Sequence, residues 1–359
     1  MMTCDPETPY NSLPFLPPET NLETPKIWKA CNAANKSLAR LREACRLIPN
    51  PDILISSIPL LEAASSSEIE NIFTTQDSLY RALSTNTDTA NPAEKEVLNY
   101  RKALYAGYAN LKERNTIDEE LLETICSTIL GAEMSRRDVT VYIGNRMRRV
   151  YTPPNDPYVL QALITQLEEY INSETDPDPL IRLALIHYQF EAIHPFTDGN
   201  GRTGRILNIL YLIAKNLLDI PVLYLSRYII QNKTEYYKLL REATAEKKFE
   251  EWICFILNAI QETADWTYTK VHAIYQLMDD TRKFCRENLP NHIYSHELID
   301  QIFLQPYCKS KYLVDAGIGN RQTAARYLKE LENIGVLTSQ KISREIIYIN
   351  TELYQLLKE

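Results

Sequence analysis

The sequence lacks any long uninterrupted apolar run. Its 359 residues contain no stretch near the roughly 18 consecutive apolar residues of a membrane-spanning helix, so we expect no membrane span. Its acidic, proline-bearing start has no apolar core of the signal-peptide type, and no signal peptide is expected. No Cys-x-x-Cys pair occurs among seven scattered cysteines, which argues against a disulfide framework or a zinc site. Such cysteines fit a reducing compartment, and we expect a cytoplasmic protein.

Basic residues are also fewer than acidic residues. Lysine and arginine number 39 against 47 acidic residues, and the net charge of −8 argues against a chain-wide nucleic-acid binder. A local basic patch remains open. Hydrophobic residues make up 45% and charged residues 24%, which are the proportions of an ordinary globular protein. The length suffices for two domains, or for one large domain with an appendage.

Glycine is scarce, and a third of it lies in one stretch. Three of the nine glycines fall within 194–205, together with a histidine, an aspartate and two arginines. Apolar runs at 180–193 and 206–218 flank this stretch, and both are long and periodic enough for buried helices. An ordinary helix–helix connection does not contain so many residues suited to catalysis and ligand binding, so the stretch is predicted to be the functional centre.

Each part of this stretch has a physical interpretation. The backbone of Gly199–Gly201 can approach a ligand closely, and it precedes a helix whose free N–H groups attract anions. Arg202 and Arg205 share one helix face, and guanidinium groups suit phosphate oxygens. Asp198 is a hard oxygen ligand suited to Mg²⁺, and His194 can accept a proton near neutral pH. Together they predict a polyphosphate cradle with a metal and a general base.

The stretch resembles the Fic family signature, His-Pro-Phe-x-Asp/Glu-Gly-Asn-Gly-Arg-x-x-Arg, without departure. Members of that family mostly transfer AMP from ATP to a hydroxyl side chain of a target protein. The resemblance implies that His194 is the base and that Asp198 binds Mg²⁺. It implies nucleotide binding by Gly199, Asn200, Gly201, Arg202, Thr203, Gly204 and Arg205. A Doc-type kinase relative would carry a lysine at Gly201, so phosphorylation is disfavoured, while UTP or another diphosphate donor remains open.

A second informative stretch ends the helix predicted over about 51–70. Ser66 and Glu70 share a helix face, and Asn71 tolerates the left-handed conformation that ends helices. By themselves these residues describe a solvated helix end. They also resemble the inhibitory motif of the family, Ser/Thr-x-x-x-Glu-Gly/Asn. That resemblance implies that Ser66, Glu70 and Asn71 inhibit the site, with Glu70 paired to Arg205.

A β-rich pair of segments interrupts the helical pattern. Residues 139–143 favour a strand, Gly144-Asn145 can turn the chain, and 147–151 can return. A lone hairpin is marginal unless something covers it or pairs with it. The pair resembles the family's flap, which implies that Ile143 and Gly144 lie over the active site and pair with an extended target segment. A surface ribbon without a partner is the alternative.

Capping residues, proline starts and apolar periodicity predict the remaining helices of the body, with 1–25 as an extended arm that packs on it. The predicted segments are 27–48, 91–112, 116–130 with Thr116 as its cap, 223–245, and 248–289 as one long helix or two abutting ones. Tyr236 and Tyr237 lie in 223–245 and resemble the family's adenine-side residues. This implies nucleotide binding by Tyr237, with core packing as the alternative.

The C-terminal part, from about residue 291, resembles a winged helix-turn-helix. Helices are predicted at 296–304, with Ser295 as its cap, and at 321–333, with Asn320 as its cap. The segment 311–316 and a turn at 317–319 lie between them, and the segments 337–343 and 345–349 can pair as a wing. Basic and polar residues lie on the predicted recognition helix, namely Arg321, Gln322, Arg326 and Lys329. Acidic residues dilute their charge, namely Asp315, Glu330, Glu332 and Glu345. DNA binding and protein docking both stay open.

The sequence therefore predicts a mainly α protein: a Fic-type helical bundle with a β-hairpin flap and a small C-terminal winged helix-turn-helix. The expected domains are 1–90, 91–290 and 291–359. The expected function is transfer of AMP from ATP, with Mg²⁺, to a target protein, the chain itself included, under inhibition by Glu70. A nucleotide-sensing transcriptional regulator that binds DNA through 291–359 is the alternative. A homodimer is an open option.

Overall fold

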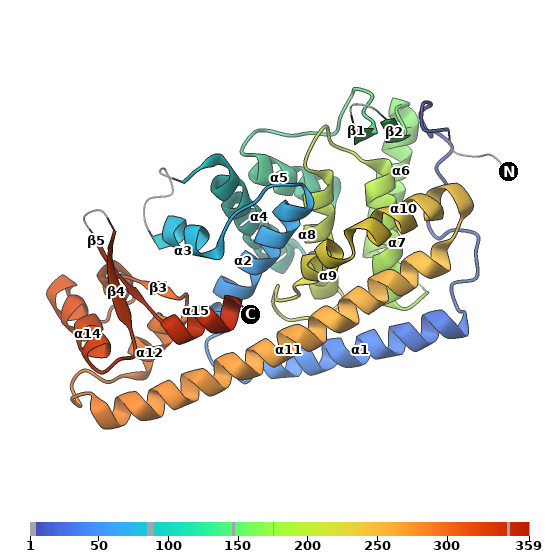
Figure 1. Ribbon diagram of the computed structural model, residues 1–359. Coiled ribbons are helices and arrows are strands. Elements are labelled where there is room, and N and C mark those ends of the chain that lie inside the picture. Colours follow the sequence, from blue (N-terminus) through green and yellow to red (C-terminus); the bar gives the residue numbers. More distant parts are fainter. Residues whose placement is uncertain (1–4, 85–89, 146–147, 175, 343–344, 359) are drawn as a thin grey trace.

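The computed structural model describes all residues except 1–4, 85–89, 146–147, 175, 343–344 and 359. The fold is mainly helical, as the sequence predicts. Eleven of the helices that the model describes form an elongated body, a small hairpin lies at one end, and a compact C-terminal unit lies at the other (Figure 1). Within the described ranges, no helix combines the length and the apolarity needed to cross a membrane.

The body is built from helices whose starts follow their capping residues. Asn91, for example, forms a reciprocal capping box with Glu94 at the start of its helix. The helices of the body are α1 (Pro25–Cys45), α2 (Asp52–Ile69), α3 (Gln76–Ser84), α4 (Pro92–Arg114), α5 (Glu119–Leu130), α6 (Pro157–Asn172), α7 (Pro179–Ile193), α8 (Asn200–Ala214), α9 (Leu225–Gln231), α10 (Lys233–Glu246) and α11 (Phe249–Asn288).

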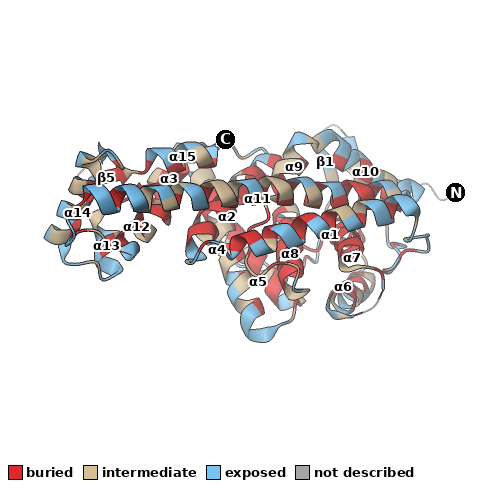
Figure 2. Cartoon of the chain, turned by 90° about the horizontal axis from the view of Figure 1, so that it is seen from below, coloured by how far each residue is buried: buried red, intermediate tan, exposed pale blue. Residues whose placement is uncertain are grey.

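Helices α1 and α11 lie side by side and form the long edge of the molecule (Figure 1). The predicted apolar stripe of α1 is buried against α11 and the core, whereas its other face is exposed (Figure 2). Helix α11 is one unbroken helix of 40 residues, so the segment predicted at 248–289 forms one long helix and not two abutting ones. Its C-terminal half reaches the C-terminal unit.

Helices α7 and α8 form the centre of the body. Every residue of α7 after Pro179 is buried, and a helix that is buried all round must be packed on every side. Gly204 lets the two helices approach, because a Cβ at this position would lie 2.8 Å from Oε1 of Glu191 and 3.0 Å from the ring of Phe190. The loop 194–199 joins these two buried helices, so its backbone is anchored at both ends.

The structure corrects several details of the predicted helices. Asp118, and not Thr116, caps α5 by accepting from the N–H of Leu121, while the Thr116 hydroxyl donates to Asn172. The segment 223–245 forms two helices, α9 and α10, because the backbone leaves the helical region at Asn232. Helix α3 was not predicted. The helix that ends at Ile69, with Asn71 at φ 64°, is confirmed.

The flap is shorter than predicted. Strands β1 (Ile143–Asn145) and β2 (Arg148–Tyr151) pair antiparallel, and the register shifts between Ile143 and Gly144. Residues 139–142 are not in the strand, and Gly144-Asn145 belongs to β1 instead of forming the turn. Residues 146–147, between the two strands, lie outside the described residues. The N-terminal arm packs on the body as predicted, since Leu13 and Leu16 are buried. The side chain of Gln166 in α6 accepts from the N–H of Leu16 and donates to its carbonyl.

The C-terminal unit combines short helices with a small sheet, and its assignment as a winged helix-turn-helix stays a prediction. It comprises α12 (His296–Phe303), β3 (Tyr307–Cys308), α13 (Ser310–Asp315), α14 (Arg321–Asn333), β4 (Thr338–Ile342), β5 (Glu345–Ile349) and α15 (Thr351–Lys358), with sheet order β3-β5-β4. Ser295 and Asn320 cap α12 and α14 as expected. Strand β3 and helices α13 and α15 were not predicted. Helix α3 packs on this unit through Tyr80, which stacks on Tyr307 at 5.7 Å between ring centroids.

Candidate active site

His194 ends α7 in a left-handed conformation, with φ 52° and ψ 61°. Its backbone N–H closes the helix on the carbonyl of Phe190, and its ring Nδ1 lies 3.3 Å from the carbonyl oxygen of Glu191. Because a carbonyl oxygen only accepts, Nδ1 carries the proton and Nε2 keeps its lone pair. Burial, with a smaller contribution from the charge of Arg137, lowers the pKa of His194 to about 4. The imidazole is therefore neutral at pH 7 and can accept a proton.

The loop after His194 is held by Asn200. Its side chain accepts from the N–H of Phe196 at 2.9 Å and donates to the carbonyl of the same residue at 2.8 Å. Gly199 follows the loop at φ 80°, a conformation that favours glycine, and starts α8. The first N–H groups of α8 lack helical acceptors and face the end of the loop, as a phosphate-binding helix start requires. Asn200 thus supports the cradle through its side chain and offers only its N–H to a ligand.

Asp198 lies beside this helix start with an exposed side chain. Its Oδ1 accepts from the N–H of Gly199 at 2.6 Å and lies 3.4 Å from Nη2 of Arg202. No cluster of three or more metal-binding side chains occurs in the part of the chain that the structure describes. A lone exposed carboxylate still suits Mg²⁺, which binds through one or two carboxylates together with substrate phosphates and water. The donor set therefore fits a metal that arrives with a polyphosphate.

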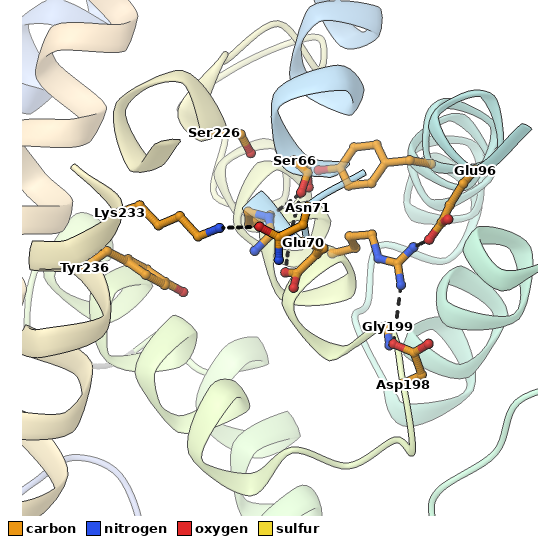
Figure 3. Close-up of polar contacts among 12 residues, drawn as sticks. Ser66, Glu70, Asn71, Glu96, Asp198, Gly199, Ser226, Lys233 and Tyr236 are labelled. Carbon is orange, nitrogen blue, oxygen red and sulfur yellow. Dashed lines mark hydrogen bonds and ion pairs between the residues drawn. The ribbon is translucent and has the colours of Figure 1, made fainter. Parts of the chain in front are cut away.

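The two arginines of α8 are buried and already paired. The guanidinium of Arg202 forms an ion pair with Glu96 of α4. Arg205 donates from Nε to the hydroxyl of Ser66 at 2.8 Å and from Nη2 to the carbonyl of Ser66 at 3.0 Å. Its Nη2 also lies 2.8 Å from Oε1 of Glu70 (Figure 3). These contacts join α8 to α2 and α4.

Glu70 lies over the start of α8. A Cβ on Gly201 would come within 2.5 Å of Oε1 of Glu70, so the carboxylate occupies the space directly above the glycine backbone. Asn71 turns the chain away after Glu70 at φ 64° and accepts from Nζ of Lys233 at 3.3 Å (Figure 3). The carboxylate therefore stands where an anionic ligand of the helix start would bind.

The electrostatics of this pair follow from burial and opposite charge. Burial alone would lower the pKa of Arg205, but the neighbouring Glu70 carboxylate raises it. Burial alone would raise the pKa of Glu70, but Arg205 outweighs it, with help from Arg202 and Lys233, so the pKa of Glu70 is lowered. Both groups are charged at pH 7. Arg205 is therefore engaged by an ion pair with Glu70 at neutral pH.

An open cleft of about 720 Å³ adjoins Glu70. The flap forms one wall with Ile143 and Gly144, and α10 forms the other with Tyr237. Its remaining lining residues are Pro6, Glu70, Val150, Tyr151, Glu191, Ala192, Thr234, Lys238, Leu240, Arg241, Thr244 and Ala245. Tyr237 is 40% exposed, whereas Tyr236 is buried and bonds Nε2 of His187 at 2.9 Å. Tyr237 therefore faces the cleft and Tyr236 belongs to the core.

Two residues of the predicted nucleotide-binding set face the protein interior. The side chain of Thr203 is fully buried. Gly204 contacts Glu191 and Phe190 of α7, and its lack of a side chain serves helix packing. Packing against the core explains why threonine and glycine occupy these two positions. Any contact of Thr203 or Gly204 with a nucleotide would therefore be made by the backbone.

Three residues near the site were not predicted from the sequence. Glu96 pairs with Arg202 from a distant helix, and no local pattern signals it. Arg137 bonds the backbone of the His194 turn. Glu191 is buried in the cleft wall, its Oε1 has no hydrogen-bond partner among the residues that the structure describes, and burial raises its pKa to about 7. The only signal for Glu191 in the sequence is the break that it makes in the apolar run 180–193.

Together, the fold and the site define a helical protein in which a neutral histidine precedes a cationic helix start, with a hairpin over the adjacent cleft. Three family models match consecutive parts of the chain: "Fic/DOC family N-terminal" over 28–109, "Fic/DOC family" over 108–212, and "Protein adenylyltransferase SoFic-like, C-terminal domain" over 277–353. The chain belongs to the Fic/DOC family. The predicted domain limits at 90/91 and 290/291 remain predictions.

Relatives and solved structures agree with this family. A curated protein of Aquifex aeolicus, "Probable protein adenylyltransferase aq_aa38", is 27% identical over 53% of this chain and 54% of its own length. "Protein adenylyltransferase fic-1" of Caenorhabditis elegans is 34% identical over 30% of this chain and 19% of its own. The match thus spans about half, or less, of these relatives. A Fic family protein from Desulfovibrio desulfuricans shares the fold, with a TM-score of 0.58 at 19% identity, covering 93% of this chain and 98% of that one.

Proposed function

We propose that this chain is a protein adenylyltransferase that moves AMP from ATP to a hydroxyl side chain of a target protein and is held back by Glu70. The observation that carries the proposal is the neutral imidazole of His194 beside the start of α8, with Arg205 on the same helix. The names of the relatives support the same activity.

In the proposed reaction, the oxygen of the target hydroxyl attacks the α-phosphorus of ATP. The O–H proton passes to Nε2 of His194, a new O–P bond forms, and the bond from the α-phosphorus to pyrophosphate breaks. The N–H groups at the start of α8 stabilise charge on the phosphate oxygens, and Arg202 and Arg205 hold the β- and γ-phosphates. Mg²⁺, bound through Asp198 and the phosphates, would neutralise charge on the departing pyrophosphate.

The cleft beside Glu70 supports the proposed positions of the substrates. Its aromatic wall at Tyr237 suits a stacked base, and a hairpin such as β1–β2 can pair with an extended peptide by strand addition. We infer that Ile143 and Gly144 present the target to His194, and that the base of the donor lies on the side of α10. Thr234 also lies on this wall.

Inhibition rests on the contact between Glu70 and Arg205. While Glu70 lies over Gly201 and bonds Arg205, a γ-phosphate loses both its space and its partner. We infer that ATP then binds in a non-productive pose. Ser66 strengthens the inhibited pose by bonding the same guanidinium, and Asn71 supplies the turn that brings Glu70 across.

The experiment that tests the activity is incubation with α-labelled ATP, UTP or GTP and Mg²⁺, followed by mass spectrometry of the chain itself and of added cell proteins. The expected result is a mass gain of one AMP on a serine, threonine or tyrosine, with UTP and GTP much weaker. A gain from UTP instead would keep the enzyme and change the donor. Absence of any nucleotide transfer, even by Glu70→Gly, would contradict the proposal.

A second function, transcriptional regulation through 291–359, draws support from α14. Arg321, Gln322 and Arg326 are exposed on this helix, as a groove-reading surface requires. The neutral His194 counts against a pure regulator, because a nucleotide sensor has no use for a general base. DNA binding without nucleotide transfer would favour the regulator, and transfer without DNA binding would favour docking of a protein.

A further inference from the structure

The C-terminal end of α7 leaves backbone carbonyls that the helix itself cannot satisfy. The first of them have partners within the site. The carbonyl of Phe190 accepts from the N–H of His194, that of Glu191 accepts from the His194 ring, and that of Ala192 accepts from the hydroxyl of Tyr151 at 2.9 Å. Tyr151 belongs to β2, so the flap already bonds the end of α7.

Arg137 bonds the next three carbonyls. Its Nη2 donates to the carbonyl of Ile193 at 3.2 Å, its Nε to that of His194 at 2.8 Å, and its backbone N–H to that of Pro195 at 2.9 Å. These bonds fix the peptide planes on both sides of His194. A non-glycine residue in the left-handed region is unfavourable, so external bonds must hold it there.

The same guanidinium bonds both legs of the flap. Nη1 donates to the carbonyl of Val139, before β1, at 3.0 Å, and Nη2 donates to that of Pro154, after β2, at 2.5 Å. One side chain therefore connects the turn that carries His194 with the start and the end of the hairpin. No sequence motif reveals this, because the four carbonyls come from three separate segments of the chain, at Val139, at Pro154 and at 193–194.

In the part of the chain that the structure describes, Arg137 has no ionic partner to explain its burial. The residue is 5% exposed, and no carboxylate among the described residues lies within ion-pair distance of it. Its positive charge lies at the C-terminal end of α7, where the helix dipole favours cations. That charge also faces the imidazole and opposes its protonation. A buried charge without a counter-ion is costly, which indicates that the carbonyl bonds compensate for it.

We propose that Arg137 is a positioning residue, which holds the His194 turn and both legs of the flap in one fixed frame. The inference rests on the proposed function, because it concerns how the base and the target segment meet. The hydrogen bonds of Arg137 to described residues all reach the His194 turn or the legs of the flap, and none reaches α8, so we expect its effect on the presentation of the target hydroxyl to Nε2 and not on binding of the phosphates.

The test compares Arg137→Lys and Arg137→Met, each in the Glu70→Gly background so that transfer is measurable. Self-modification with α-labelled ATP gives kcat and KM, and calorimetry gives the Kd of Mg-ATP. Arg136→Met is the matched control, since that neighbour pairs with Glu119 and donates to Gln161 on the opposite side. We expect kcat to fall about ten- to a hundredfold in both Arg137 variants, because a small misplacement of reacting groups costs that much. The Kd of Mg-ATP should not change.

A second readout separates positioning from mere folding. In Arg137→Met the acid limb of the pH profile, and the pKa of His194 followed by NMR, should move upward, while Arg137→Lys keeps the charge and leaves both in place. If Arg137→Met does not fold, Arg137→Lys decides through kcat. An unchanged kcat in a folded Arg137 variant, or a parallel loss of Mg-ATP binding, overturns the proposal. If the Glu70→Gly parent transfers nothing, the proposed function fails, and the NMR titration still reports on Arg137.

Discussion

Oε1 of Glu70 lies 2.8 Å from Nη2 of Arg205, although the two residues are 135 positions apart in the sequence. The same oxygen stands over Gly201, at the start of the predicted phosphate cradle. One carboxylate therefore lies where the proposed phosphate would bind and pairs with the arginine proposed to hold it. In the proposed function, this relationship restrains the catalytic loop.

The Ser66 hydroxyl should contribute a measurable part of that restraint. It accepts from Nε of Arg205 at 2.8 Å, and without it the inhibited pose loses one charge-assisted hydrogen bond. We expect Ser66→Ala to raise self-modification by roughly three- to tenfold, less than Glu70→Gly, in line with a modest net hydrogen-bond energy. Ser65→Ala is the matched control, since its hydroxyl bonds Tyr224 at 2.6 Å instead. Equal rates for both variants would exclude this role of Ser66.

Replacement of His194 should separate chemistry from binding. His194 lies beside the helix start and does not belong to the glycine–arginine cradle. We expect Glu70→Gly with His194→Ala to bind Mg-ATP as Glu70→Gly does, but to transfer AMP about 10²–10⁴-fold more slowly, the usual cost of losing a general base. Calorimetry and labelling measure the two properties. Undiminished labelling would mean that another group takes the proton.

Stability should depend on pH through His187. This histidine is fully buried against Trp252, and burial lowers its pKa to about 3 from an unfolded value near 6.5. The unfolded chain therefore binds a proton that the folded chain refuses, so stability falls as pH drops below 6.5. Between pH 7 and 5 the loss from this residue is roughly 2 kcal/mol. Urea unfolding should show a flatter pH dependence for His187→Gln, and an identical slope would contradict the assignment.

DNA binding by the full chain should be weak and sensitive to salt. The exposed basic residues of α14 are few, and Lys329 is paired with Glu332 at 2.9 Å. Each phosphate contact adds about 0.9 to the log–log salt slope, so a slope no steeper than roughly 3 is expected from three cations. Fluorescence anisotropy against salt concentration measures it. Tight, sequence-specific binding at physiological salt would instead support the regulator.

The sequence predicted the local parts of this molecule well. The stretch 194–205 could be identified because its functional residues are consecutive in the sequence. The end of α2 followed from Asn71, and the starts of α4 and α14 followed from Asn91 and Asn320. The pairing of Glu70 with Arg205 came only from resemblance to a family motif, since nothing in the spacing requires it. Contacts such as Arg202 with Glu96 depend on packing of distant helices, and single-chain periodicity does not encode them.

The weakest predictions fell where tertiary contacts override local preference. The β-rich residues 139–142 are held outside the strand beside Arg137, which bonds the carbonyl of Val139. A helix over 223–245 was favoured by composition, yet the chain bends at Asn232 so that α9 packs on α2 while α10 lines the cleft. Helix α3 spans only nine residues, fewer than the window over which apolar periodicity distinguishes a helix, and it packs on the C-terminal unit through Tyr80.

The most direct test of the central claim is the rate of AMP incorporation by Glu70→Gly relative to the wild-type chain, at saturating Mg-ATP, with Glu70→Gly/Arg205→Ala alongside. A charge-assisted hydrogen bond contributes about 1.5–3 kcal/mol, and each ~1.4 kcal/mol corresponds to a factor of ten. We predict an increase of about ten- to a hundredfold for Glu70→Gly, and loss of that gain in the double variant, which lacks the arginine for the γ-phosphate. If Glu70→Gly labels no faster than the wild type while both bind Mg-ATP, Glu70 is not an inhibitor and 66–71 is a simple helix end.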